Sequence, residues 1–180
     1  MAQGEFWVFG YGSLMWNPGF AYQERQVATL HGYRRSFCMH SIEHRGTPDR
    51  PGLVLALEEM AGASCRGVGF RVGPDHAEET LAYLRARELV TDAYLERHCP
   101  LTLDDGRQVE ALTYVMDLEH AQYARDLSLD DQAAIIGRAV GGRGPNTDYL
   151  HATVAALDEQ GIADEELAEL ARRVADQAGI

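Results

Sequence analysis

The sequence predicts an α+β fold in a single domain spanning residues 1–180. A chain of 180 residues has the length of one domain. Runs of aromatic and β-branched residues, bounded by turn-forming residues, fill the first half, and apolar residues with helical spacing fill the end of the chain. Because strands come first and helices later, the pattern favours α+β over a regular βαβ alternation. We therefore expect strands mainly in the first two-thirds and helices at the C-terminal end.

The expected strands follow the β-branched and aromatic runs of the first 117 residues. They cover residues 5–10, 27–33, 36–42, 53–57, 65–72, 93–103 and 108–117. The turn signal Asp104-Asp105-Gly106 joins the last two runs into a hairpin. Residues 43–52 hold two prolines and two glycines, so they predict an irregular loop.

The first expected helix begins near Asp75, which with Glu78 resembles a capping box. Its apolar face comprises Ala77, Leu81 and Leu84. A second helix, opened by Ser128 with Asp131, is expected to bury Ala133, Ile136 and Val140 before a glycine-rich loop at 141–144 ends it. A third begins near Asn146 or Thr147 and carries Leu150, Val154 and Leu157. Asp164 is expected to cap the last, with Leu167, Leu170, Ala171 and Val174 inside.

The composition is that of a soluble globular protein, with 46% hydrophobic and 24% charged residues, and excludes disordered, collagen-like and disulfide-dense classes. A formal net charge of −12 argues against a nucleic-acid or membrane partner. Three widely spaced cysteines indicate reduced thiols rather than a disulfide framework. Residues 1–5 do not resemble a signal peptide, and no apolar run reaches the length of a membrane helix. We therefore expect a cytoplasmic protein.

Glu88 is the first candidate for chemistry. If the helix that begins near Asp75 continues far enough, Leu81, Leu84 and Glu88 share one face, and the carboxylate stands at the end of an apolar stripe. Burial would then raise its pKa and suit it to acid and base catalysis near neutral pH. If the helix instead ends by Ala86, Glu88 is a solvated loop charge. Both interpretations stay open at this point.

A second candidate is the turn Gly10-Tyr11-Gly12-Ser13, which follows the first expected strand. Two glycines let the main chain turn tightly and let a ligand approach main-chain N–H groups. The segment lacks the lysine of a phosphate-binding loop and the third glycine of a dinucleotide fingerprint. A plain strand-to-loop turn is the alternative interpretation.

Other polar residues give weaker signals. The histidine and cysteine spacings match no zinc motif, and Ser13 lacks a nucleophile-elbow context, so neither a metal site nor a catalytic triad is expected. Arg35 and Arg45 could each bind a substrate carboxylate or be surface charges. Tyr149 could face an anion at a helix start or pack in the core.

Four segments occur together in one order. They are residues 8–16, beginning Val8-Phe9-Gly10-Tyr11-Gly12-Ser13-Leu14, then 44–52 with His44-Arg45-Gly46-Thr47-Pro48, then Tyr83-Leu84 with Arg87-Glu88, and finally Asn146-Thr147 with Tyr149-Leu150. In this order they resemble the ChaC-type γ-glutamylcyclotransferases, in particular the bacterial members. The blocks cover almost the whole chain up to the last helix.

This resemblance implies a small mixed β-barrel surrounded by helices, and an enzyme that needs no cofactor and no metal. It implies cleavage of glutathione without water, by attack of the α-amine on the γ-carbonyl, to give 5-oxoproline and cysteinylglycine. The catalytic residue it implies is Glu88. The substrate-binding residues it implies are Val8, Phe9, Gly10, Tyr11, Gly12, Ser13, Leu14, Arg35 and Tyr149.

Two alternatives to this function remain. A related group of cyclotransferases acts on other γ-glutamyl amines or γ-glutamyl amino acids, with a similar glycine turn and a glutamate. A non-catalytic γ-glutamyl-binding module would keep the pocket without turnover, although the presence of Glu88 counts against it.

Overall fold

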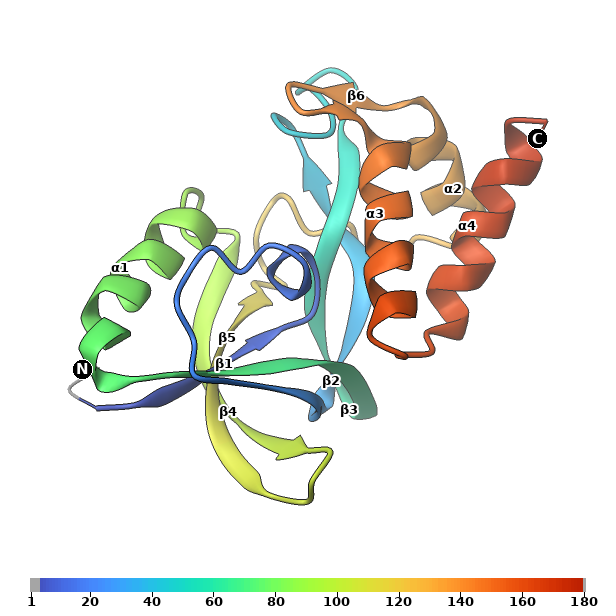
Figure 1. The fold of residues 1–180 in the computed structure, drawn as a ribbon. Helices are drawn as coiled ribbons and strands as arrows, with labels where there is room; N and C mark the ends of the chain where they lie inside the picture. The colour runs from blue at the N-terminus through green and yellow to red at the C-terminus, as the bar shows by residue number, and fades with distance from the viewer. Residues whose placement is uncertain (1–3, 180) are drawn as a thin grey trace. The chain divides into compact units, whose positions relative to one another are not determined.

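The computed structural model describes residues 4–179, so Met1 to Gln3, part of the segment in which no signal peptide is expected, lie outside the described residues. Five strands form a closed barrel in the order β1-β3-β2-β4-β5, which confirms the α+β class and the mixed barrel (Figure 1). The barrel strands are β1 Phe6–Gly10, β2 Glu24–Ser41, β3 Gly52–Val72, β4 Tyr94–Leu103 and β5 Gln108–Met116. No helix among residues 4–179 combines the length and the apolar character needed to cross a membrane.

The described chain groups into two compact units, and the single domain over 1–180 stays a prediction. The first unit contains residues 4–35 and 57–120, and the second contains residues 36–56 and 121–179. The long strands β2 and β3 contribute residues to both units.

In the first unit β1 is held from both sides. It pairs antiparallel with β3, with Val8 opposite Phe70, and parallel with β5, with Val8 also opposite Leu112. The hairpin predicted around Asp104-Asp105-Gly106 is confirmed, because β4 and β5 pair antiparallel from Tyr94 opposite Met116 to Thr102 opposite Gln108. Strand β1 is therefore hydrogen-bonded along both edges, and the glycine turn follows directly from its end.

Two strand boundaries predicted from the sequence are wrong. The predicted strands 27–33 and 36–42 are parts of one strand, β2, which ends at Ser41, and residues 53–57 and 65–72 belong to one strand, β3. The charged residues between the first two predicted strands find partners on other segments: Arg34 forms a salt bridge with Glu58 at 2.8 Å, and the buried Arg35 donates to the Tyr11 carbonyl. A paired charge does not break the backbone ladder, so both strands continue.

Helix α1, Ala77–Glu88, begins later than the capping-box pattern predicts. Pro74 opens a 3₁₀ turn, η2 Pro74–His76, because its fixed φ suits the first helical position. Asp75 lies inside that turn and therefore does not cap α1. The N-cap of α1 is His76, whose side chain makes no capping hydrogen bond. The helix does continue to Glu88, which excludes the interpretation that it ends by Ala86.

The second unit contains the helices α2 Leu129–Arg138, α3 Asn146–Glu159 and α4 Glu165–Gln177, which pack against one another (Figure 1). The predicted cap at Ser128 is confirmed, since its Oγ accepts a hydrogen bond from the Asp131 N–H at 3.1 Å. The assignment of Val140 to the apolar face of α2 is wrong. The helix ends at Arg138, and Val140 is 56% exposed in the short hairpin of β6 Val140–Gly141 and β7 Gly144–Pro145, which replaces the predicted loop.

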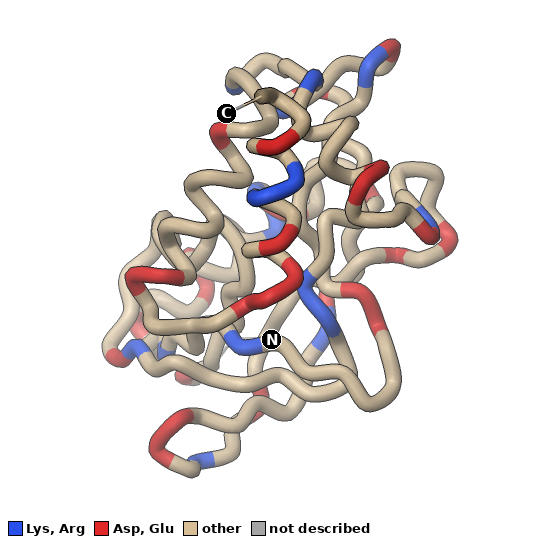
Figure 2. The backbone as a smooth tube through the Cα atoms, turned by 90° about the vertical axis from the view of Figure 1, so that its right-hand side faces the viewer, with Lys and Arg blue, Asp and Glu red and all other residues tan. Residues whose placement is uncertain are grey.

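The helices of the second unit bury apolar side chains. In the second unit, Leu150 and Leu157 of α3 are buried, as are Leu167, Leu170 and Val174 of α4. Charged residues of both signs follow one another along α4 (Figure 2), and Arg172 and Arg173 both pair with Glu169. The predicted cap of α4 is confirmed, because Asp164 Oδ1 accepts a hydrogen bond from the Leu167 N–H at 3.0 Å.

Asp164→Ala is expected to lower the free energy of unfolding by about 1 kcal/mol, because the Leu167 N–H at the start of α4 loses its acceptor. Asp164→Asn is the matched control, since an asparagine oxygen caps equally well. Urea unfolding followed by circular dichroism measures both changes. Equal stability of the Ala and Asn variants would contradict a capping role.

Candidate active site

The candidate site of the first unit is built on the turn that follows β1. The predicted segment Val8, Phe9, Gly10, Tyr11, Gly12, Ser13, Leu14 comprises the end of β1, a two-residue turn and the start of a short 3₁₀ helix, η1 Ser13–Met15. The first turn of η1 is closed by the Met15 N–H, which donates to the Gly12 carbonyl at 2.9 Å. The sequence-predicted turn is therefore an ordered connection with defined hydrogen bonds.

Side chains from two other barrel strands bind carbonyl groups of this segment. Thr113 of β5 donates to the Phe9 carbonyl at 3.2 Å, and Arg35 of β2 donates through Nε to the Tyr11 carbonyl at 2.7 Å. Arg35 also donates through Nη2 to the Arg66 carbonyl. Arg35 is only 5% exposed, and its guanidinium binds main chain rather than facing solvent. The structure thus places it where it orders the turn.

Close packing against β3 explains one glycine that the sequence did not single out. A Cβ added at Gly67 would lie 2.4 Å from the Gly10 carbonyl oxygen and 2.7 Å from the Phe9 ring. Only a residue without a side chain lets β3 approach the turn this closely. In the sequence, Gly67 is visible only as a glycine within a strand pattern, which can mark a close approach of another backbone.

Glu88 is the last residue of α1, and its side chain is 16% exposed. Burial raises the pKa of this carboxyl above its ordinary range, and the neighbouring Arg87 opposes the shift. The position at a helix C-terminus also disfavours a negative charge. The sequence prediction of a carboxyl with a raised pKa at the end of an apolar stripe agrees with this geometry.

An apolar cluster connects the helix of Glu88 to the turn. Leu84, one helical turn before Glu88, is fully buried in a cluster with Val8 and Leu14 of the turn segment. Tyr114 of β5 belongs to the same cluster, and the charge of Glu88 helps to raise the pKa of its phenol, after burial and Glu96. The position of Glu88 is therefore fixed relative to β1 and β5.

Arg87 is the residue that the sequence analysis left without a role. Its Nη2 donates to Ser13 Oγ at 2.9 Å, and its Nη1 donates to the Asn17 carbonyl at 2.7 Å and to the Tyr83 hydroxyl at 3.0 Å. Its Nε lies 3.6 Å from Glu88 Oε1. One guanidinium thus contacts both the turn and the candidate catalytic carboxylate. The sequence does indicate one of these contacts, because Tyr83 and Arg87 are four residues apart and such side chains are neighbours on a helix.

Arg87→Met is expected to lower the free energy of unfolding by about 1–3 kcal/mol, because it leaves several polar groups of the turn without their donor. Arg85→Met on the same helix is the matched control. Arg85 is 53% exposed and pairs with Glu96, so its loss is expected to cost about 1 kcal/mol or less. Chemical denaturation measures both, and an equal effect of the two substitutions would contradict the proposed ordering of the turn.

Glu88→Gln is expected to raise the midpoint of thermal unfolding near pH 7.5 and to leave it unchanged near pH 4. The fold raises the pKa of Glu88, so the folded protein binds this proton more tightly than the unfolded chain does. The stabilisation is present below the unfolded pKa and is lost as pH rises through the folded pKa. Thermal scans at several pH values measure the difference, and a pH-independent difference would contradict the burial effect.

Tyr149 belongs to the second unit, where it lies in the first turn of α3. Its hydroxyl accepts a hydrogen bond from the Leu55 N–H at 3.2 Å, and its ring packs edge-to-face on Phe37 at 5.8 Å between centroids. Arg45 stacks over the same ring at 5.7 Å and donates to the Arg143 carbonyl at 2.9 Å. Tyr149 and Arg45 therefore join α3 to the main chain and to the aromatic side chain Phe37 of the second unit.

The three cysteines are buried thiols. Cys38, Cys65 and Cys99 form no disulfide bond with one another, and the burial of Cys38 and Cys99 agrees with their place in apolar strand patterns. Within residues 4–179 no three His, Cys, Asp or Glu side chains are grouped closely enough to hold a metal ion.

Comparison with known proteins gives a consistent result. The family model described as ChaC-like protein matches residues 6–177. The glutathione-specific gamma-glutamylcyclotransferase of Escherichia coli (strain K12) is 40% identical over 168 residues, which cover 93% of this chain and 72% of that protein. The Schizosaccharomyces pombe protein of the same name is 34% identical over 165 residues, 82% of this chain and 80% of the relative.

A solved structure gives the same fold. The crystal structure of a yeast gamma-glutamyl cyclotransferase specific to glutathione superposes with a TM-score of 0.85 at 24% identity, covering 96% of each chain. At this identity the likeness concerns the fold, a closed barrel with its helices.

Proposed function

The chain belongs to the ChaC-like family, and from that membership we propose that it is a glutathione-specific γ-glutamylcyclotransferase. It converts the γ-glutamyl group of glutathione to 5-oxoproline and releases cysteinylglycine. Support comes from the relatives named for this activity at 40% and 34% identity. The structural observation that carries the proposal is Arg87, which contacts both the glycine turn at Ser13 and the largely buried carboxylate of Glu88.

The reaction needs a base and an acid but no water. The α-amine of the γ-glutamyl group loses a proton and attacks its own γ-carbonyl carbon, so that a new C–N bond closes the five-membered ring. The bond from that carbon to the cysteinyl nitrogen then breaks as this nitrogen takes up a proton. The ring nitrogen gives up its second proton to become the lactam amide, and the released amine of cysteinylglycine takes that proton up as an ammonium group. Because attack is intramolecular, the protein has mainly to hold the substrate in the attacking conformation.

We assign both proton transfers to Glu88. As a carboxylate it accepts the proton of the α-ammonium group, and as a carboxylic acid it returns that proton to the leaving nitrogen. A group that serves both steps works best with a pKa near the working pH, and burial moves the pKa of Glu88 in that direction.

The turn is proposed to bind the γ-glutamyl group through main-chain N–H groups. The Tyr11 carbonyl points to Arg35, and in a trans peptide the N–H of the next residue points the opposite way. The Gly12 N–H is therefore directed away from Arg35, and we assign it to the oxyanion that develops on the γ-carbonyl. Residues Val8 to Leu14 form this binding segment, with Arg35 fixing its geometry. Tyr149 is assigned to substrate binding on the family resemblance alone.

The proposed location is the cytoplasm, and the proposed partner is the small-molecule substrate alone. Cys38, Cys65 and Cys99 are not joined in disulfide bonds, which suits a reducing compartment. The acidic net charge of −12 disfavours nucleic acid and anionic membrane surfaces.

Incubation of the purified protein with glutathione tests the function, with mass spectrometry reading 5-oxoproline and cysteinylglycine. We expect both products in equal amounts, and much slower turnover of γ-glutamyl-alanine. Faster turnover of γ-glutamyl-alanine would assign the protein to the cyclotransferases of other γ-glutamyl amines. Thermal stabilisation by glutathione without product would indicate a binding module.

A further inference from the structure

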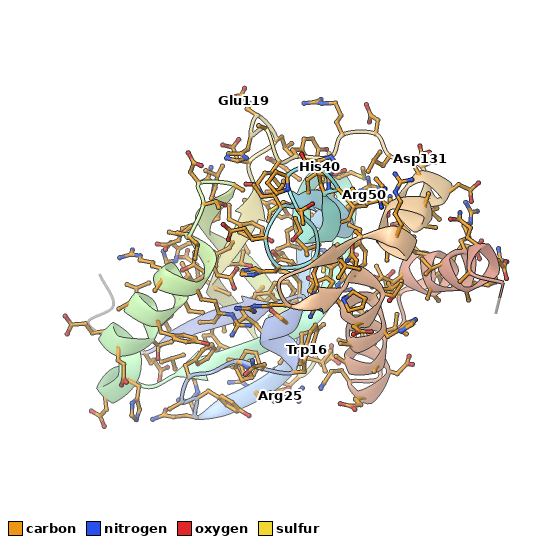
Figure 3. The ribbon with its side chains drawn as sticks, turned by 90° about the horizontal axis from the view of Figure 1, so that it is seen from above. Trp16, Arg25, His40, Arg50, Glu119 and Asp131 are labelled. Carbon is orange, nitrogen blue, oxygen red and sulfur yellow. The ribbon has the colours of Figure 1, made fainter. Side chains whose placement is uncertain are left out.

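A cavity of about 350 Å³ lies in the second unit, formed by residues that no part of the proposed reaction uses. Its walls come from the end of β2, from the loop before β3 and from α2. The lining residues are His40, Asp49, Arg50, Pro51, Ile135 and Arg138. Figure 3 labels His40 and Arg50, two of these lining residues. The volume is that of a small-molecule site.

The charged side chains of this cavity are unpaired within the described part of the chain. Among residues 4–179, the side chains of Asp49, Arg50 and Arg138 form no ion pair and no hydrogen bond. Elsewhere most arginines of this acidic protein are engaged, as Arg172 is with Glu169 and Asp176. Two guanidinium groups and one carboxylate are therefore gathered around one cavity with their hydrogen-bonding capacity available.

His40 adds a neutral polar group to the wall. Its Nδ1 is buried without a hydrogen-bond partner, the only such side-chain nitrogen or oxygen in the described part of the chain. Burial lowers the pKa of the imidazole, against the effect of a hydrogen bond to the main chain of Gly52, so the ring is neutral near pH 7. If the ring donates to Gly52, the other nitrogen is an acceptor, and an unpaired buried acceptor is rare in folded proteins.

We propose that this cavity binds a small zwitterion, an amino acid or a dipeptide with an ionised carboxylate and an ionised ammonium group. Arg50 and Arg138 fit the carboxylate, because a guanidinium donates two parallel hydrogen bonds to a pair of carboxylate oxygens. Asp49 fits the ammonium group. A phosphate or a simple carboxylate would leave Asp49 facing like charge, and a net charge of −12 on the protein disfavours polyanions further.

This site is separate from the proposed reaction in its residues, so its test does not depend on turnover. The probe is glycylglycine, which has both charged ends and no γ-glutamyl group. Isothermal titration calorimetry on the full chain compares it with N-acetyl-glycylglycine, which lacks the ammonium group, with glycylglycinamide, which lacks the carboxylate, and with inorganic phosphate. We expect saturable binding of glycylglycine, and binding at least about tenfold weaker for each of the other three.

Two variants locate the binding. Arg138→Gln and Asp49→Asn are each expected to weaken glycylglycine binding by about tenfold or more, because each removes one charged partner of the ligand. Arg25→Gln is the matched control, an exposed arginine of the first unit that does not line the cavity (Figure 3). Parallel titrations with glycine and cysteinylglycine identify a free amino acid or a dipeptide as the better occupant, and either supports the proposal.

Three outcomes would overturn it. One is the absence of glycylglycine binding at millimolar concentrations. Another is binding of phosphate or of the N-acetyl compound as tight as that of glycylglycine, which would indicate a simple anion site. The third is binding unchanged by Arg138→Gln and Asp49→Asn, which would place the ligand elsewhere on the protein.

Discussion

Glu88→Gln is expected to lower kcat on glutathione by at least about 100-fold, the usual size of a general acid–base contribution. Glutamine keeps the size of the side chain at the end of α1 but can neither accept the proton of the α-ammonium group nor return it to the leaving nitrogen. The KM should change far less, since the substitution leaves the turn and its hydrogen bonds intact. Steady-state formation of 5-oxoproline measures both constants.

The control for this substitution is Glu78→Gln, an exposed carboxylate in the first turn of the same helix. It is expected to leave kcat unchanged. The thermal stability expected of Glu88→Gln at neutral pH, equal to or above that of the native protein, would exclude unfolding as the cause of its loss of activity. Turnover by Glu88→Gln within a few-fold of the native rate would rule out Glu88 as the acid–base residue.

The placement of Glu88 could be predicted because it depends on local periodicity. Leu84 and Glu88 are four residues apart, and a helix that continues through both must align them. The degree of burial could not be predicted in the same way. It depends on the cluster of Leu84 with Val8, Leu14 and Leu112, which come from segments distant in the sequence.

The wrong predictions of strand and helix boundaries have a common physical origin. Each boundary depends on contacts between residues that are distant in sequence. The break predicted near Arg34 and Arg35 is absent because both charges find partners on other segments, Glu58 and the Tyr11 carbonyl. Val140 continues the helical spacing of Ile136, yet the chain leaves the helix after Arg138 to form the β6–β7 hairpin. Local pattern cannot show where tertiary contacts override it.

The cavity of the second unit illustrates the same limit. His40 and Asp49 come from one stretch of sequence, but Arg138 lies almost ninety positions further along. The histidines of this stretch, His40 and His44, match no zinc motif. A site made of two arginines, a carboxylate and an imidazole has no sequence signature of its own, so only the fold brings these residues together.

Arg35→Met is the substitution expected to have the second-largest effect on activity. It removes the guanidinium that donates to both the Tyr11 carbonyl and the Arg66 carbonyl. The turn would lose its fixed orientation, and with it the direction of the Gly12 N–H. We expect a fall in kcat/KM of about tenfold or more and a lower free energy of unfolding, by about 1–3 kcal/mol.

The stability of the ligand-free protein distinguishes this positioning role from the carboxylate-binding role considered for Arg35 in the sequence. A side chain kept only to bind substrate lowers affinity when it is removed, but it does not destabilise the free protein. Arg35→Lys should recover part of the activity, since an ammonium group can serve one of the two carbonyls. Arg25→Met on the same strand, at an exposed position, should change neither quantity. Loss of glutathione affinity with unchanged stability would return Arg35 to direct contact with the substrate.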